Sequence, residues 1–474
     1  MHIIDLAIFI AYMAAMLGVG LYFYKKNSST DDYYVGGRNL GSMHVGLSVV
    51  ATDVGGGFSI GLGGLGFTMG LSGSWMLFTG LIGAWVAAVV LIPTVSRLAK
   101  EKQFLTFPQL FEHFYDRRVA LAAGVISAIG YLGFTSSQIL AGAKLASASF
   151  ESLDMTTALV IMGVIAVVYT VMGGIKAVIY TDTIQWIILM AGLIFIGLPM
   201  GYYAIGGYSA IVETLNPAFV SLGNVAWYTI VNWGITIIPI WFVGMTLYQR
   251  IYACGDEKVA KRAWFIAGLF EWPVMAFMGV TLGLFARVAA EQGMFEAVGY
   301  AQAADLDAEL GLPLLLRSIL PVGLMGLMMS AYFSAIMSTA DSCLMAASGN
   351  LLTDVLGKWT KHMPEDKVVR FGQLLTLVVG VAALAIALFM TNVLELMLHS
   401  YAFMVSGLLI PVLAALFIKK AGRVAAFVSM ITGGATTLML IALEVSLPFQ
   451  LDANIYGIMA SLVVFLIINK FETK

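Results

Sequence analysis

Apolar segments long enough to cross a bilayer follow one another along almost the whole chain. A helix of about 20 apolar residues spans the hydrocarbon core of a membrane, and we recognise thirteen such segments in the 474 residues. They cover residues 3–24, 41–70, 73–97, 118–149, 155–174, 180–204, 225–250, 262–288, 313–347, 369–390, 393–418, 423–446 and 453–470. No Pro/Ser-rich linker divides them, so we predict a single all-α polytopic membrane domain.

The composition excludes several classes of protein. The chain is 60% hydrophobic and 11% charged, with a mean hydropathy of +0.92, whereas soluble domains have about 25% charged residues. A net charge of -2 argues against nucleic acid as a partner. Cys254 and Cys343 are too few for a disulfide framework. We therefore expect a lipid bilayer as the surroundings. We also expect both cysteines to be free thiols, Cys254 in a charged loop and Cys343 in an apolar segment.

Basic residues concentrate in alternate loops, which sets the expected orientation. Loops that face the cytoplasm carry an excess of Lys and Arg. The loops after the odd-numbered segments include Lys25, Arg97, Lys176, Lys258, Lys358 and Lys419, and we assign Arg250 to the same set at the inner end of segment 225–250. The sequence thus predicts a plasma (inner) membrane protein with the N-terminus outside and the C-terminus in the cytoplasm.

Two segments contain helix-breaking residues. Segment 41–70 carries the run ATDVGGG at 51–57, and segment 225–250 carries Gly234, Pro239 and Gly244. Glycine and proline interiors weaken a helix, and a break in a membrane survives where the freed backbone groups meet an ion, a ligand or neighbouring protein. The breaks lie five segments apart, so the two units have opposite orientations. This spacing predicts an inverted-repeat transporter with discontinuous helices.

Polar side chains lie inside apolar segments at two further places. These are Asp182 and the run Ser338-Thr339-Ala340-Asp341-Ser342. Polar groups at membrane depth usually mark an ion or substrate pathway, and hydroxyl and carboxylate oxygens suit a hard cation. Structural alternatives remain: Asp182 can cap a helix that begins at residue 180, and Ser338 and Thr339 can bond to their own helix backbone.

Three motifs resemble one family. They are ATDVGGG at 51–57, YTVMGGIKAVIYTDTIQ at 169–185 and MSTADS at 337–342. The chain is similar to the sodium:solute symporter family, which includes sodium/proline, sodium/sugar and choline transporters. The resemblance implies a LeuT-type 5+5 fold, with a leading helix at 3–24, repeats at 41–204 and 225–418, and trailing helices at 423–470. It also implies Na⁺-coupled symport of a small organic solute into the cell by alternating access. Separately, we expect a monomer.

The resemblance places the ions on particular residues. The main Na⁺ site corresponds to Ala51, Val54, Ala335, Ser338 and Thr339. A second Na⁺ site, found in some members, corresponds to Asp182, Ser338, Asp341 and Ser342. Asp341 departs from the pattern, because some members with this site carry Ser there. The additional carboxylate can strengthen the cation site, bind a proton or pair elsewhere.

The family pattern also suggests a solute site, with less detail. The residues expected to line it are Gly55, Gly56, Phe134, Gln138, Trp241 and Tyr401, and we place Asp53 in coupling or gating. The solute class stays open between amino acid, sugar, carboxylate and quaternary amine. Lys144 and Glu271 are further intramembrane charges that pair internally or, for Lys144, extend toward the membrane surface. Glu271 has no assigned role.

Two rival functions come from other classes. A proton-coupled carrier of the same fold would use Asp53, Asp182 or Asp341, which can all titrate. A membrane enzyme would need clustered catalytic groups. The histidines are scattered over His2, His44, His113, His362 and His399, and neither HExxH nor GxSxG occurs. We therefore predict a transporter without catalytic residues.

Overall fold

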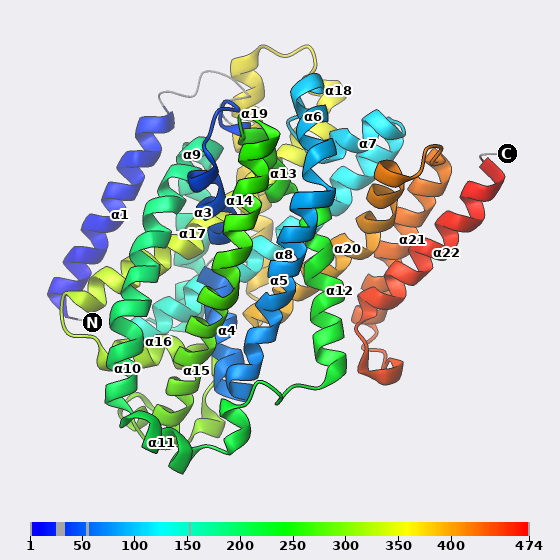
Figure 1. Cartoon of the computed structure of the whole chain (residues 1–474). Helices are drawn as coiled ribbons and strands as arrows, with labels where there is room; N and C mark the ends of the chain where they lie inside the picture. Colours follow the sequence, from blue (N-terminus) through cyan, green and yellow to red (C-terminus); the bar gives the residue numbers. More distant parts are fainter. Residues whose placement is uncertain (1, 25–33, 54–55, 151–152, 473–474) are drawn as a thin grey trace.

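The chain folds into a bundle of helices. The computed structural model describes residues 2–24, 34–53, 56–150 and 153–472, and these residues contain no β-strand (Figure 1). The α-helices are α1 (Ile3–Tyr24), α3 (Ser42–Asp53), α4 (Gly56–Met69), α5 (Trp75–Val90), α6 (Ile92–Lys102), α7 (Pro108–Phe114), α8 (Arg117–Ser149), α9 (Met155–Gly192), α10 (Leu198–Ala204), α11 (Gly207–Thr214), α12 (Trp227–Val243), α13 (Met245–Ala253), α14 (Glu257–Leu269), α15 (Ala276–Glu291), α16 (Ala308–Ile319), α17 (Leu324–Asn350), α18 (Gly357–Thr360), α19 (Glu365–Ala387), α20 (Val393–Phe417), α21 (Arg423–Ala442) and α22 (Ala453–Glu472).

Fewer helices meet the length and composition expected of a membrane span than the thirteen segments predicted from the sequence. Among the described residues, eight helices are long and apolar enough to cross a membrane, or nine if the bent pair α12–α13 is one span. The stretches Ile3–Met16 of α1 and Met155–Val171 of α9 are apolar but shorter than the length required for this count. α17 has 27 residues but carries hydroxyl and carboxyl groups that lower its hydropathy. The count of thirteen therefore stays a prediction.

Two segments were expected to be interrupted, and the expected break in the first falls on residues outside the described part of the chain. α3 ends at Asp53 and α4 begins at Gly56, while Val54 and Gly55 lie outside the described residues. In the other segment, α12 and α13 meet at Gly244 and are bent by 43°. The bend follows the end of α12, so Pro239 lies inside a helix and does not itself make the break.

Two other expected segments are also divided. The stretch 313–347 is not one helix, because α16 ends at Ile319 and α17 begins at Leu324. The stretch 262–288 contains a helical turn, η4 (Phe270–Met275), between α14 and α15. Trp272 in η4 has the non-helical dihedrals φ -139° and ψ 124°. Proline at position 273 removes a backbone donor, which explains a break there that the apolar pattern alone did not reveal.

Glycines bring α4 and α15 together. A Cβ on Gly66 would lie 2.1 Å from the carbonyl oxygen of Val280, and one on Gly283 would lie 2.0 Å from the carbonyl oxygen of Gly63. The two backbones therefore approach more closely than any side chain would permit, as small residues allow in membrane helices. This contact fixes α4 against α15, which follows η4.

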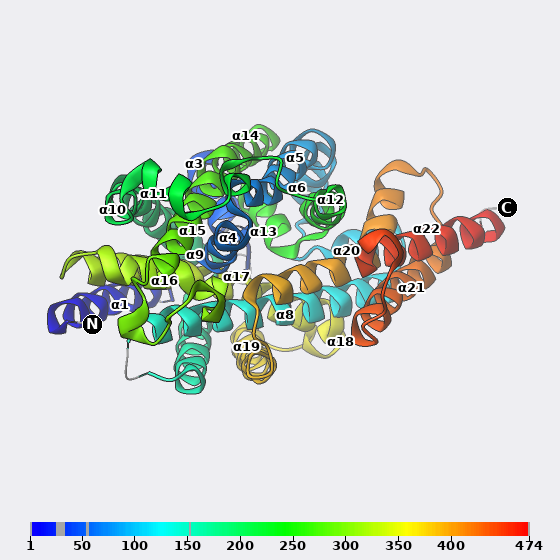
Figure 2. The same cartoon turned by 90° about the horizontal axis from the view of Figure 1, so that it is seen from below.

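The central helices carry the polar residues of interest. α8 and α17 are buried along most of their length and pack on each other. Figure 2 shows α1 at one edge of the bundle and α21 and α22 at the opposite edge, with α4, α8 and α17 between them. Hydroxyl and carboxyl groups of α17 are thus enclosed by protein rather than exposed to lipid.

Candidate functional site

α17 contacts α3, α9 and α13 through two adjacent groups of polar residues. The first group, here called the carbonyl site, contains Ala51, Ala335 and Thr339. The Thr339 hydroxyl lies 3.1 Å from the carbonyl oxygen of Ala51 and 3.2 Å from that of Ala335. Ala51 lies in α3, two residues before the last residue described in that helix. Three uncharged oxygens from two helices therefore face one point.

Ser338, the neighbour of Thr339, faces another way. Its hydroxyl donates to Oδ1 of Asp182 in α9. Of the five predicted main-site residues, the structure brings together Ala51, Ala335 and Thr339; it directs Ser338 to a carboxylate, and Val54 lies outside the described residues.

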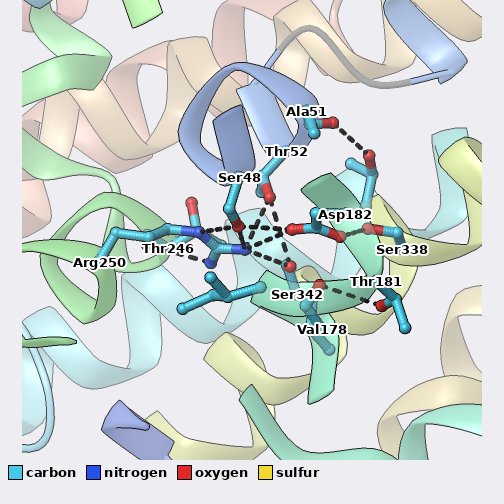
Figure 3. Close-up of polar contacts among 12 residues, drawn as sticks. Ser48, Ala51, Thr52, Val178, Thr181, Asp182, Thr246, Arg250, Ser338 and Ser342 are labelled. Atoms are coloured by element: carbon cyan, nitrogen blue, oxygen red, sulfur yellow. Dashed lines mark hydrogen bonds and ion pairs between the residues drawn. The ribbon is translucent and has the colours of Figure 1, made fainter. Parts of the chain in front are cut away.

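The second group surrounds Asp182 and is here called the Asp182 cluster (Figure 3). It consists of Ser48, Thr52, Asp182, Arg250, Ser338 and Ser342. Ser48 donates to Oδ2 of Asp182 at 2.5 Å. One terminal nitrogen of Arg250 lies 2.7 Å from the Thr52 hydroxyl, 2.9 Å from the Ser342 hydroxyl and 3.5 Å from Oδ2 of Asp182. The guanidinium thus contacts Asp182 and Ser342, two of the four residues predicted to hold a second Na⁺.

The ion pair in this cluster is completely enclosed. The side chains of Arg250 and Asp182 are both 0% exposed. Removing one partner of such a pair is costly, because it leaves a buried charge without compensation. Arg250 was placed with the basic inner loops in the sequence, and that placement is wrong. The sequence did contain an indication of its buried position, because Thr246, Gln249 and Arg250 are polar residues within an apolar segment. Counting Arg250 with the basic residues of the inner loops overlooked this indication.

Two expectations for this region are corrected. Asp182 lies inside α9 and bonds to Ser338 and Ser48, so it is not the N-cap of a helix. Asp341 does not join the Asp182 cluster: its Oδ1 accepts a hydrogen bond from Thr170 of α9. Positions 341 and 342 point about 100° apart around the helix axis, so the Asp341 side chain reaches Thr170 while the Ser342 hydroxyl lies against Arg250.

The predicted solute residues are only partly brought together. The rings of Phe134 and Tyr401 meet edge to face, 5.0 Å apart, and the Tyr401 hydroxyl lies 3.2 Å from Oδ1 of Asp53. Gln138 is buried beside Ser137, to which its amide donates at 3.2 Å. Gly56 begins α4, and Gly55 lies outside the described residues.

Trp241 packs on a different neighbour. Its ring lies 6.2 Å from that of Trp264, and a Cβ on Gly83 of α5 would be 2.3 Å from the Trp241 ring. Lys144 is paired, with Nζ 2.6 Å from carboxylate oxygens of both Asp307 and Glu309. An internal ion pair therefore explains Lys144.

Comparison with known proteins places this arrangement in a family. The family model described as sodium:solute symporter family matches residues 33–433. The chain belongs to the sodium:solute symporter family. It is therefore a membrane transporter rather than an enzyme, and sodium is its coupling ion.

Similar proteins cover nearly the whole symporter. The high-affinity proline transporter PutP of Bacillus subtilis (strain 168) is 29% identical over 436 residues, which are 90% of this chain and 89% of that protein. The sodium/glucose cotransporter of Vibrio parahaemolyticus is 26% identical over 498 residues, covering 97% of this chain and 89% of that one.

Two solved structures are similar in fold. One is the substrate-bound outward-open state of a Na⁺-coupled sialic acid symporter, with a TM-score of 0.78 and 22% identity over 99% of this chain and 98% of that chain. The other is a nucleobase-cation-symport-1 family transporter in a closed conformation, with a TM-score of 0.59 and 14% identity over 94% and 95% of the chains. The LeuT-type helical fold predicted from the sequence is confirmed.

Proposed function

We propose that this symporter carries a small organic solute into the cell together with Na⁺ bound at the carbonyl site. The supporting observation is the Thr339 hydroxyl, 3.1 Å from the carbonyl of Ala51 across the interface between α3 and α17. Uncharged carbonyl and hydroxyl oxygens are the ligands that replace the hydration shell of alkali cations. Val54 and Ser338 complete the set when Ser338 turns from Asp182 toward the ion.

The ion couples to solute through α3. Ala51 and Asp53 are two residues apart at the end of this helix, and Asp53 is bonded to Tyr401 in the region of Phe134. Holding Ala51 against α17 therefore positions the region around Asp53 and Tyr401, to which we also assign Gly55, Gly56, Gln138 and Trp241 as solute-binding residues. Because coupling free energies are reciprocal, Na⁺ and solute raise each other's affinity by the same factor. Alternating access then moves α3 and α4 relative to α17.

The orientation follows from the basic helices. α6, α7 and α18 lie at one end of the bundle and α11 at the other (Figure 1). α6 carries Arg97, Lys100 and Lys102, and α18 carries Lys358. We assign this end to the cytoplasm by the positive-inside rule, with the beginning of α1 outside and the molecule acting as a monomer in the plasma membrane.

A second Na⁺ at the Asp182 cluster would have to displace Arg250. The guanidinium already supplies the positive charge that Asp182 requires, so we assign one Na⁺ to each transport cycle. Proton coupling remains the alternative function, supported by the burial of Asp53, Asp182 and Asp341.

Equilibrium binding of ²²Na⁺ to the purified protein tests this assignment without knowledge of the solute. We expect one saturable Na⁺ per chain. Uptake into proteoliposomes by an imposed Na⁺ gradient, with the pH difference abolished by an ionophore, then separates the two functions. Transport of solute that persists without Na⁺ and requires a proton gradient would replace sodium coupling with proton coupling.

A further inference from the structure

A cavity of about 480 Å³ lies beside α6, at the end of the bundle where α18 also lies (Figure 1). It is here called the basic cavity, because Arg38, Arg97 and Lys100 line it. The buried residues Ile251 and Tyr252 of α13 also contribute to its lining. The cavity contains none of the residues of the carbonyl site or of the Asp182 cluster, so sodium binding leaves it unexplained.

The acidic residues of this cavity already have partners. Asp256 accepts a hydrogen bond from the backbone nitrogen of Val259 at 2.8 Å and thereby caps α14. Glu257 forms an ion pair with Lys261 at 2.7 Å. Because both carboxylates are engaged in this way, the basic side chains of the cavity are in excess.

Two of the basic side chains are available to a ligand. Arg97 and Lys100 are both exposed, and neither side chain makes a hydrogen bond or an ion pair with another described residue. Arg38 is partly buried, and its guanidinium donates to the carbonyl oxygen of Phe104 at 2.9 Å, which holds it in the cavity wall. Guanidinium and ammonium groups together favour a phosphate, whose oxygens accept several charge-assisted hydrogen bonds.

The helix that carries these cations also presents an apolar face. α6 continues α5 through Leu91, whose dihedrals of φ -88° and ψ -52° are helical. Residues spaced three, four or seven apart share one face of a helix, and here they are Val86, Val90, Arg97 and Lys100. Val86 is 40% exposed and Val90 is 37% exposed. The same face is therefore apolar along α5 and basic at the cavity.

This order of groups matches the chemistry of a phospholipid. Arg97 and Val90 are seven residues apart, which corresponds to about 10 Å along a helix. A phosphate at Arg97 therefore places the hydrocarbon of the same molecule beside Val90. A free anion would leave the apolar face without a partner, and a lipid without net charge would leave the two cations unbalanced. Basic pockets between helices at the cytoplasmic surface suit anionic headgroups.

We propose that the basic cavity binds the headgroup of an anionic phospholipid, whose phosphate contacts Arg97 and Lys100 and whose acyl chain lies along the exposed face of α5. The site goes beyond the proposed function, because neither sodium nor solute is needed to form it. The orientation proposed for the molecule makes this lipid one of the cytoplasmic leaflet.

The bound headgroup joins α6 to the helices that carry the two polar groups of the transport site. The backbone nitrogen of Leu40 donates to the carbonyl oxygen of Ala253 at 3.0 Å, which ties the segment before α3 to the end of α13. Arg38 lies two residues from this contact and lines the same cavity. A phosphate between Arg38 and α6 therefore holds α3 and α13 in place, so the lipid should stabilise the folded protein.

Matched lipids test the proposal on the purified, delipidated protein in detergent. Thermal stability is measured with phosphatidylglycerol and phosphatidylcholine of identical acyl chains, and with inorganic phosphate, since a ligand that binds only the folded state stabilises it. We expect saturable stabilisation by phosphatidylglycerol, apparent binding of phosphatidylcholine that is weaker by about tenfold or more, and no stabilisation by inorganic phosphate. Equal effects of the two lipids would contradict recognition of charge. Equal stabilisation by inorganic phosphate would identify the ligand as a free anion and overturn the lipid assignment.

Variants test the residue assignment. In Arg97→Gln/Lys100→Gln we expect the apparent affinity for phosphatidylglycerol to fall about tenfold or more, because each basic residue near an anionic headgroup contributes to binding. Lys358→Gln/Lys361→Gln is the matched control, since it removes two exposed charges of the same end outside the cavity and should bind as wild type. Wild-type affinity in the first variant would place the lipid elsewhere and overturn the proposal.

The melting temperature in lipid-free detergent shows whether the variant is folded. Arg97 and Lys100 are exposed, so we expect their replacement to leave this temperature unchanged. If the double variant does not fold, Arg97→Gln is compared with Lys358→Gln in the same titration, and equal affinities of these two variants for phosphatidylglycerol would overturn the proposal.

Discussion

Ser338 and Thr339 are adjacent on α17 but belong to different kinds of site. The Thr339 hydroxyl faces two backbone carbonyls, whereas the Ser338 hydroxyl faces the carboxylate of Asp182. The carbonyl site has no charged side chain among these contacts. The Asp182 cluster has one carboxylate and one guanidinium. Neighbouring hydroxyls can therefore serve an ion site and an ion pair, because successive helix positions point about 100° apart.

The difference between the carbonyl site and the Asp182 cluster indicates which of them can bind a mobile cation. Uncharged oxygens at the carbonyl site gain from a sodium ion without having to release another cation. At the Asp182 cluster, Na⁺ competes with Arg250, which is covalently attached and already makes contacts to Thr52 and Ser342. We expect the first region to control sodium dependence and the second to control stability, and four substitutions test this division.

Arg250→Gln should have the largest effect. It leaves Asp182 buried without its cation, and breaking a buried pair in this way costs about 3–5 kcal/mol. The free energy of unfolding, measured by denaturant titration in detergent and Na⁺-free buffer, should fall by that amount. Arg287→Gln is the control, because Arg287 pairs with Glu291 at 2.6 Å near the surface, where such pairs contribute at most about 1 kcal/mol.

Sodium makes this test sharper. In Arg250→Gln, the freed oxygens of the Asp182 cluster should accept Na⁺, which would restore about 2.7 kcal/mol at a concentration 100 times its dissociation constant. A variant as stable as the Arg287 control in Na⁺-free buffer would show that the ion pair does not carry the stability assigned to it.

Thr339→Ala should raise the Na⁺ concentration for half-maximal binding about tenfold, equivalent to about 1.4 kcal/mol. The change removes the hydroxyl between Ala51 and Ala335, and Thr339→Ser should retain it. Thr376→Ala is a matched control, since that buried hydroxyl bonds to the carbonyl of Gly372 in its own helix at 3.0 Å. Equal Na⁺ affinities for Thr339→Ala and the control would exclude the carbonyl site.

Ser338→Ala should have an intermediate effect and weaken Na⁺ affinity about threefold, as measured by ²²Na⁺ binding. This corresponds to less than the about 1 kcal/mol that a typical hydrogen bond contributes. Its hydroxyl contacts Asp182 here and reaches the ion only after turning. An effect as large as that of Thr339→Ala would place Ser338 fully in the main site when Na⁺ is bound.

Asp341→Asn should have the smallest effect, below about twofold on Na⁺ affinity, because an amide oxygen preserves the acceptor that Thr170 uses. A loss of Na⁺ affinity comparable to that of Thr339→Ala would show that Asp341 belongs to a cation site. It would then contradict the division between the carbonyl site and the Asp182 cluster.

Much of the fold was predictable from the sequence, because bilayer thickness imposes long apolar helices. The bend at Gly244 followed from the glycines and proline inside its segment. The break at Trp272 and the division between α16 and α17 did not, since neither interrupts the apolar pattern strongly. Local composition thus predicted breaks rich in glycine better than breaks inside otherwise apolar stretches.

By itself, the sequence determined that this chain is a helical transporter of the sodium:solute symporter family and that oxygen-bearing residues of α3, α9 and α17 gather inside it. Only the tertiary structure decided which of them meet. Arg250 and Asp182 are 68 positions apart, and Tyr401 and Asp53 are 348 positions apart. Helical periodicity fixes the face of a side chain along its own axis, but charge neutralisation inside the membrane depends on how those axes pack against one another.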